Sequence, residues 1–229
     1  MTDIEWKPFS LTHVEYPSGD LVGKFLALGS LLPVALIVSF ITLILFRRDL
    51  HTIFYFIGIV INEVVNLILK HTIQQPRPFQ RQDLYTEYGM PSSHSQLIWF
   101  FVVYSILFLI FRLHHISGSL IDMVGKAVVG LGLLLAACLV SYSRIYLLYH
   151  SWSQVLCGAL VGGTLGASWF TIVHLVLTPM FPIVASWNIC ELLMVRDTTL
   201  IPNILWFEYT HARAENRARS RKLISMKSQ

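Results

Sequence analysis

The sequence predicts an all-α membrane protein, a polytopic helical bundle with about five to six transmembrane segments. Of its 229 residues, 55% are hydrophobic and only 13% are charged, and the mean hydropathy is +0.61. Soluble globular domains use roughly 25% charged residues, so a soluble fold of this size is excluded. The apolar residues also form long unbroken blocks, which is typical of helices that cross a bilayer.

Five blocks are long enough to cross a hydrocarbon layer of roughly 30 Å, which needs about 20 helical residues. They are residues 23–46, 51–69, 96–111, 124–142 and 153–177. The stretch 181–194 fits either a short sixth membrane element or an interfacial segment. We therefore divide the chain into an N-terminal segment (1–22), a transmembrane domain (23–178), and a membrane-associated segment with a basic tail (179–229).

Charged residues give the orientation. The basic side chains lie at alternate ends of the blocks: Arg47, Arg48, Arg112, Lys126 and those between 213 and 227. The positive-inside rule places these in the cytosol. The acidic N-terminal segment and the loops 70–95 and 143–152 then face the opposite, lumenal side. The basic tail is also suited to contact anionic lipid headgroups.

The second block carries a polar stripe. Asn62, Asn66 and Lys70 are spaced four residues apart and share one helix face, and Glu63 lies near it. Ionisable side chains at membrane depth usually face the interior of a bundle. Taken alone, this stripe could merely join helices through hydrogen bonds. Because Lys70 leads directly into the loop 70–95, we expect it to have a functional role.

The two lumenal loops collect cations and serines suited to a phosphoryl group. The guanidinium groups of Arg77 and Arg144 and the ammonium group of Lys70 can neutralise phosphoryl oxygens. Ser92 and Ser93 open a predicted helix, and the free N–H groups of a helix start bind anions. We therefore predict that these residues bind phosphate: Lys70, Arg77, Ser92, Ser93 and Arg144.

Two histidines complete the candidate catalytic set. His94 and His150 can act as a general acid and a nucleophile near neutral pH. Gln154 lies one helical turn after His150, so its oxygen can accept the ring N–H and fix the tautomer. No metal or other cofactor is expected, because the histidines lack carboxylates at ligand spacing and the cations would repel a metal ion.

Three motifs resemble the signature of the PAP2 family, which includes lipid phosphate phosphatases. They are Lys-x6-Arg-Pro from Lys70, Pro-Ser-x-His ending at His94, and Ser-Arg-x5-His ending at His150. The resemblance implies that the first motif, the serines and Arg144 bind phosphate. It also implies that His94 protonates the leaving group and that His150 attacks phosphorus, giving a phosphohistidine that water hydrolyses.

The chain departs from the family pattern at two positions. Ser93 stands where the family usually has Gly, and Gln154 stands where it usually has Asp. A neutral Gln brings no charge to stabilise an imidazolium, so we expect a less basic His150. That suits a diphosphate, whose phosphate leaving group has a pKa of about 6. The conjugate acid of an alkoxide leaving group has a far higher pKa, close to that of water.

Within the family, the extended motifs and the segment 196–209 are similar to animal enzymes that hydrolyse dolichyl diphosphate. This resemblance implies a multi-pass enzyme of the endoplasmic reticulum membrane with its active site facing the lumen. It would release phosphate from dolichyl diphosphate and leave dolichyl phosphate, recycling the lipid carrier for protein N-glycosylation. The implied partners are a polyprenyl (dolichyl) diphosphate and the lipid bilayer, with no nucleic acid. The oligomeric state stays open.

Other functions remain open at this stage. The same chemistry would serve a phosphatase acting on another lipid, such as phosphatidate. A non-catalytic membrane protein could bind anionic lipid with the same cationic cage, although the presence of both histidines argues against it. A transporter would be expected to carry inverted repeats, and we find none in the sequence.

A glycine repeat follows the third motif. Gly158, Gly162 and Gly166 continue the helix stripe of His150 and Gln154 at four-residue spacing. Small residues at this spacing allow two membrane helices to approach closely. We therefore expect close packing of the helix that follows the predicted nucleophile.

Overall fold

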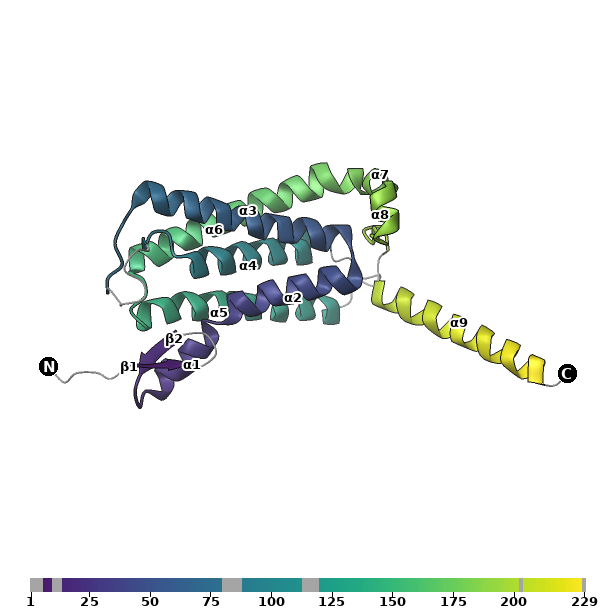
Figure 1. The fold of residues 1–229 in the computed structure, drawn as a ribbon, viewed down its shortest axis with the longest axis horizontal. Helices are drawn as coiled ribbons and strands as arrows, with labels where there is room; N and C mark the ends of the chain where they lie inside the picture. Colours follow the sequence, from purple (N-terminus) through teal and green to yellow (C-terminus); the bar gives the residue numbers. More distant parts are fainter. Residues whose placement is uncertain (1–5, 10–13, 80–87, 113–119, 202–203, 228–229) are drawn as a thin grey trace.

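A computed structural model describes residues 6–9, 14–79, 88–112, 120–201 and 204–227. Long helices lie side by side to form a bundle, with an N-terminal hairpin at one end and a projecting helix at the other (Figure 1). The bundle helices are α2 (Leu32–Arg47), α3 (Leu50–Ile73), α4 (Ser93–Phe111), α5 (Leu120–Tyr146) and α6 (Trp152–Ile172). The hairpin pairs strand β1 (Trp6–Phe9) with strand β2 (Val14–Pro17). The projecting helix is α9 (Ile204–Lys227).

Within the described ranges, five helices are long and apolar enough to cross a membrane. This confirms the predicted helical membrane bundle. The first crossing is interrupted, since α1 (Leu21–Gly29) and α2 meet at a break beside Pro33, which lies in the first turn of α2. Proline fits a first helical turn but cannot donate the hydrogen bond that would continue α1. The antiparallel hairpin β1–β2 was not anticipated from the sequence.

Helices α4 and α6 pack closely through the predicted glycine repeat. Gly158, Gly162 and Gly166 are all buried. A Cβ atom on Gly158 would lie 2.7 Å from the carbonyl oxygen of Ser92, and one on Gly166 would lie 2.7 Å from that of Phe100. A Cβ atom on Gly162 would overlap the Gln96 carbonyl. The expected close packing is therefore confirmed, and it places the start of α6 against the start of α4.

The polar stripe of α3 faces α4. Asn62, Asn66 and Gln96 are completely buried. Asn66 Nδ2 donates to Gln96 Oε1 at 2.8 Å, and Gln96 Nε2 donates to the carbonyl and Oδ1 of Asn62 at 2.9 and 3.1 Å. Buried polar groups need such partners, so the network fixes α3 against α4. Lys70, one turn beyond Asn66, is thereby positioned relative to the first turn of α4.

Residues 181–194 do not form a sixth crossing. After α6 the chain makes a π-helical turn (Val173–Leu177) and a 3-10 turn (Thr178–Met180). It then forms α7 (Phe181–Ala185) and α8 (Asn188–Leu192), each of five residues. A five-residue helix is about 7.5 Å long, far short of a bilayer. The chain turns at this end of the bundle before α9 begins (Figure 1).

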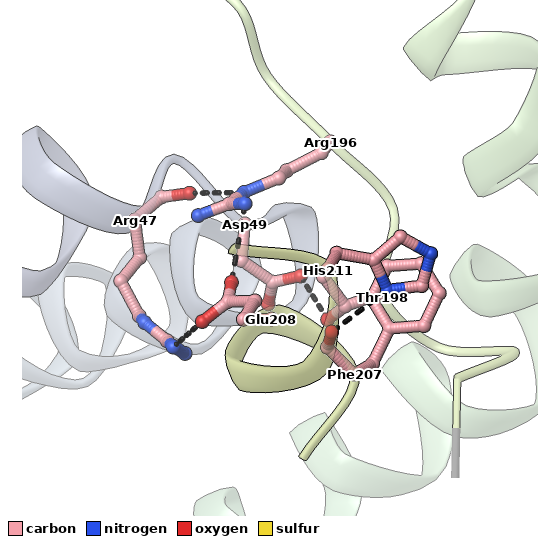
Figure 2. A network of polar contacts seen from close by, with 7 residues as sticks. All are labelled: Arg47, Asp49, Arg196, Thr198, Phe207, Glu208 and His211. Atoms are coloured by element: carbon pink, nitrogen blue, oxygen red, sulfur yellow. Dashed lines mark hydrogen bonds and ion pairs between the residues drawn. The ribbon is translucent and has the colours of Figure 1, made fainter. Parts of the chain in front are cut away.

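A polar network fastens the base of α9 to the turn between α2 and α3 (Figure 2). Glu208 forms ion pairs with Arg47 at 2.5 Å and with Arg196 at 3.2 Å. Arg196 Nε also donates to the Arg47 carbonyl at 2.9 Å. Asp49, which caps α3, accepts a hydrogen bond from Thr198 at 2.5 Å. We call Arg47, Asp49, Arg196, Thr198 and Glu208 the α9 anchor.

The motif loops and the basic segments lie at opposite ends of the bundle. The end of α3, the start of α4 and the connection from α5 to α6 lie at the end that carries the N-terminal hairpin (Figure 1). The turn after Arg47 and the start of α9 lie at the other end. The prediction that both motif loops share one end of the bundle is therefore confirmed.

Candidate active site

The first motif spans the end of α3 and the loop beyond it. Lys70 lies in the last turn of α3, and Gln74 ends the helix in the left-handed conformation with φ of 51°. Arg77 then lies between two prolines in non-helical chain. The Gly89 N–H donates to the Gln75 carbonyl at 2.7 Å. This bond ties the Arg77 loop to the segment that leads into the second motif.

The second motif opens α4. Ser92 is the N-cap residue, Ser93 begins the helix, and His94 follows in its first turn. The Ser92 N–H donates to the Gln154 carbonyl at 3.1 Å, which joins this turn to the start of α6. Among the described residues, the buried Ser92 hydroxyl has no hydrogen-bond partner. A buried hydroxyl without a partner is unfavourable, and a bound phosphate oxygen would satisfy it.

The third motif ends α5 and turns back on itself. Arg144 lies in the last turn of α5. Its carbonyl accepts hydrogen bonds from the N–H groups of Tyr149 at 3.0 Å and His150 at 3.1 Å. Its guanidinium carbon lies 4.0 Å from the centroid of the Tyr149 ring. The tight return therefore holds His150 close to Arg144, and both side chains are buried.

Hydrogen bonds fix the tautomer of His150. Its Nδ1 lies 3.0 Å from the Gly89 carbonyl oxygen and 3.3 Å from Gln154 Oε1. A carbonyl oxygen can only accept, so Nδ1 must carry the proton and donate it. In the neutral ring, Nε2 then holds the lone pair that a nucleophile needs. The predicted contact between Gln154 and His150 is present.

The orientation of the Gln154 amide follows from its other partners. Its Oε1 accepts the N–H of Ser151 at 3.2 Å, and its Nε2 donates to the Pro76 carbonyl at 2.9 Å. Those main-chain groups leave only one assignment of oxygen and nitrogen. Gln154 therefore joins His150 to the Arg77 loop. An aspartate could not donate to the Pro76 carbonyl.

The surroundings of His150 favour its neutral form. Burial, together with the nearby charges of Arg144 and Arg77, lowers the pKa of His150 to about 3, although the hydrogen bond with Gln154 opposes this shift. Both effects penalise the imidazolium. His94 lies near enough to interact electrostatically with the guanidinium groups of Arg144 and Arg77 and with the ring of His150. The imidazole of His150 is therefore neutral, with an available lone pair, at physiological pH.

The structure brings the predicted site residues together and adds three that the motifs did not indicate. The added residues are Gly89, Pro76 and Tyr149. The first two act through main-chain carbonyls, which no side-chain pattern reveals. The only sequence signal for Gly89 was its position directly before Met-Pro-Ser. In the structure a side chain does not fit there, because a Cβ atom would lie 2.6 Å from Gln154 Nε2. Tyr149 occupies a position that the third motif leaves unspecified.

Residues 51–177 match the model of the PAP2 superfamily. The chain belongs to the PAP2 superfamily. It is also 56% identical to Dolichyldiphosphatase 1 of Rhinolophus ferrumequinum and 55% identical to that of Homo sapiens. Each match extends over 221 residues and covers 95% of this chain and 93% of the relative.

A solved structure supports the fold assignment. The transmembrane PAP2 type phosphatidylglycerolphosphate phosphatase from Bacillus subtilis superposes with a TM-score of 0.56 at 21% sequence identity. The superposition covers 68% of this chain and 78% of that chain. The chain therefore shares the fold of that protein. Its membership of the PAP2 superfamily, its five candidate spans and its identity to the curated relatives make it a multi-span membrane lipid phosphatase.

Proposed function

We propose that this PAP2 enzyme hydrolyses dolichyl diphosphate to dolichyl phosphate and inorganic phosphate. The proposal is supported by relatives named Dolichyldiphosphatase 1 that match over 95% of the chain at 55–56% identity. It is also supported by Gln154, which replaces a carboxylate with a neutral amide. A weakly basic histidine suits a phosphate leaving group better than an alkoxide.

The first chemical step forms a phosphoenzyme. Nε2 of His150 attacks the terminal phosphorus, and the bond from that phosphorus to the bridging oxygen breaks. The anionic diphosphate offsets the cations around His94 and favours its protonated form, so dolichyl phosphate leaves with a proton from the His94 imidazolium. The cations and helix-start donors of the site stabilise the charge on the equatorial oxygens. The residues with this role are Lys70, Arg77, Ser92, Ser93 and Arg144.

The second step regenerates the enzyme. His94, now neutral, accepts a proton from a water molecule that attacks the phosphohistidine. The bond between phosphorus and Nε2 breaks, and inorganic phosphate forms. His150 returns to its neutral state with the proton still on Nδ1. One water is consumed, and one phosphate and one dolichyl phosphate are released in each cycle.

One observation carries this mechanism: the pair of acceptors on Nδ1 of His150. The Gly89 carbonyl and Gln154 Oε1 hold the proton on that atom. They therefore direct the lone pair of Nε2 away from the loop, as an in-line attack on phosphorus requires. The low pKa of His150 keeps this lone pair unprotonated at neutral pH.

The activity test compares three lipids. Purified protein in detergent is given dolichyl diphosphate, dolichyl phosphate or phosphatidate, with EDTA present, and released phosphate is measured. We expect the fastest release from the diphosphate and none from His150→Ala. An acid quench with labelled terminal phosphate should trap a labelled enzyme only when His150 is present. Fastest release from phosphatidate would overturn the substrate, and release by His150→Ala would overturn the nucleophile.

We further propose that the protein resides in the endoplasmic reticulum membrane with its site facing the lumen, where it would recycle the carrier for N-glycosylation. A cysteine-accessibility test examines the orientation. Cys138, Cys157 and Cys190 are replaced by alanine, and a single cysteine is introduced by Ser18→Cys or Ser220→Cys, both at exposed positions. An impermeant maleimide should label the second variant in sealed microsomes and the first only after permeabilisation. The reverse pattern would refute the orientation.

A further inference from the structure

The phosphate-binding Arg144 rests on an aromatic ring. Its guanidinium carbon lies 4.0 Å from the centroid of the Tyr149 ring, and Tyr149 is only 7% exposed. A cation held over a ring at this distance is attracted by the negative face of the ring, and the attraction is stronger where water is excluded. The ring therefore limits the positions that the Arg144 side chain can take.

The same tyrosine is held by the N-terminal segment. Its hydroxyl oxygen accepts the main-chain N–H of Glu15, in strand β2, at 3.0 Å. Three residues earlier, the Tyr146 hydroxyl donates to Asp20 Oδ2 at 2.7 Å, and Asp20 also caps helix α1. Main-chain hydrogen bonds from the first turn of α1, and then the hydrogen bond from Tyr146, lower the pKa of Asp20, so its carboxylate is ionised at neutral pH.

Apolar packing also joins the N-terminal segment to the turn between Arg144 and His150. Val14 of β2 and Ala27 of α1 form one buried cluster with Leu147 and Tyr149. Between the last two lies Leu148, which adopts a φ of 58°. A leucine rarely takes this left-handed conformation, because its Cβ crowds the following carbonyl. The buried side chains on either side of Leu148 therefore hold the turn in a shape that it would not take alone.

We infer that the N-terminal unit, residues 14–29, is a clamp on the turn between Arg144 and His150, and that Tyr149 is the positioning residue through which it acts. Tyr149 sets the Arg144 guanidinium for binding the phosphoryl group. The clamp lies outside residues 51–177, the part of the chain that matches the family. The inference rests on the proposed phosphate-binding role of Arg144.

The test compares substitutions that remove different parts of the contact. Tyr149→Phe keeps the ring beneath Arg144 and removes only the hydroxyl bond to Glu15. Tyr149→Leu removes both. The measured quantities are KM and kcat for dolichyl diphosphate, and the equilibrium Kd for inorganic phosphate. Cation–π attraction in a buried site predicts weakening of phosphate binding on the order of fivefold to tenfold in Tyr149→Leu. Tyr149→Phe should retain most of the affinity.

Coupling to Arg144 separates positioning from general structural damage. In an Arg144→Gln background, Tyr149→Leu should weaken phosphate binding no further. For the clamp itself, Leu147→Ala should weaken phosphate binding in the same way as Tyr149→Leu. The matched control Leu28→Ala, on the exposed face of α1, should not change it.

Two results would overturn the inference. One is wild-type phosphate affinity in Tyr149→Leu. The other is an equal loss of affinity from Tyr149→Leu with and without Arg144. Phosphate binding is measured at equilibrium and needs no lipid turnover. A failure to hydrolyse dolichyl diphosphate would therefore refute the proposed substrate while the clamp remained testable.

Discussion

At the residue scale, the amide of Gln154 performs two tasks that a carboxylate could not combine. Its oxygen accepts the Nδ1–H of His150 at 3.3 Å, and its nitrogen donates to the Pro76 carbonyl at 2.9 Å. The first contact fixes the tautomer of His150, the proposed nucleophile, and the second ties the Arg77 loop to Gln154. With glutamine in place of the usual aspartate, the site lacks a negative charge that would stabilise an imidazolium.

Gln154→Glu should make the enzyme sensitive to acid. A carboxylate beside Nδ1 raises the pKa of His150 from its value of about 3, so protonation removes the nucleophile at higher pH than in the wild type. The ratio of variant to wild-type kcat/KM should therefore fall as the pH is lowered from about 8 to about 5. The control Gln154→Leu adds no charge and should lower kcat/KM by a constant factor. A flat ratio for the Glu variant would contradict this account.

His94→Ala should discriminate between leaving groups. A general acid contributes roughly 100-fold to 10,000-fold when the leaving group needs a proton. A phosphate monoester leaves with little protonation, whereas an alkoxide needs it. In single-turnover assays, the loss of rate on dolichyl phosphate should therefore exceed the loss on dolichyl diphosphate by about tenfold or more. Equal losses on the two lipids would exclude His94 as the acid.

At the element scale, the contact between α4 and α6 decides where the two histidines meet. His94 lies in the first turn of α4, and His150 lies just before the start of α6. They are brought together because glycines on α6 let the main chain of α4 approach within van der Waals distance. Ser95 adds a buried hydrogen bond to the Val155 carbonyl at 2.9 Å. The candidate site is thus built on helix ends, which carry Lys70 and Arg144, while the loop beyond α3 supplies Arg77.

Gly162→Ala should destabilise the bundle, and Gly163→Ala should not. A Cβ atom at 162 would overlap the carbonyl of Gln96, whereas one at 163 would meet only Val103 Cγ2 at 3.6 Å, an ordinary contact. Overpacking costs about 1–3 kcal/mol, while alanine is intrinsically the better helix former by about 1 kcal/mol. Thermal unfolding in detergent should therefore show a lower Tm only for the first variant. An unchanged Tm in Gly162→Ala would show that α6 can shift away from α4.

At the scale of the whole molecule, the two ends of the bundle carry different tasks. One end holds the candidate active site, which packs against the N-terminal unit. The other end holds the α9 anchor, where Glu208 bridges Arg47 and Arg196 (Figure 2). The side chains of Arg47 and Glu208 are each 32% exposed, so solvent screens their attraction. The anchor therefore orients α9 and adds little to the stability of the bundle.

Glu208→Gln should loosen α9 without affecting catalysis. Amide hydrogen exchange over residues 204–212 should become faster, because both ion pairs of the anchor are weakened. The Tm and the hydrolysis rate should stay at wild-type values, since the site lies at the opposite end. The matched control is Glu215→Gln, which removes a pair with Arg219 inside α9 and should leave exchange at the base unchanged. A large loss of activity in Glu208→Gln would show that the two ends are coupled.

The sequence by itself determined the helical membrane bundle and the common end of the motif residues, and it predicted the candidate site residues. Apolar block length is set by bilayer thickness, and phosphoryl chemistry restricts the side chains that can perform it. The glycine spacing likewise predicted the close packing of α6. Such features are local in the chain, so their periodicity and composition are enough to find them.

Only the tertiary structure decided which hydrogen-bond and packing partners hold the site residues in place. The donor atom of His150 depends on the Gly89 carbonyl, which is 61 residues away in the chain. The orientation of Gln154 depends on Pro76, and the support of Arg144 depends on Tyr149 and strand β2. Main-chain carbonyls and N–H groups are common to nearly every residue. Their partners are therefore set by packing between distant segments, which no residue pattern encodes.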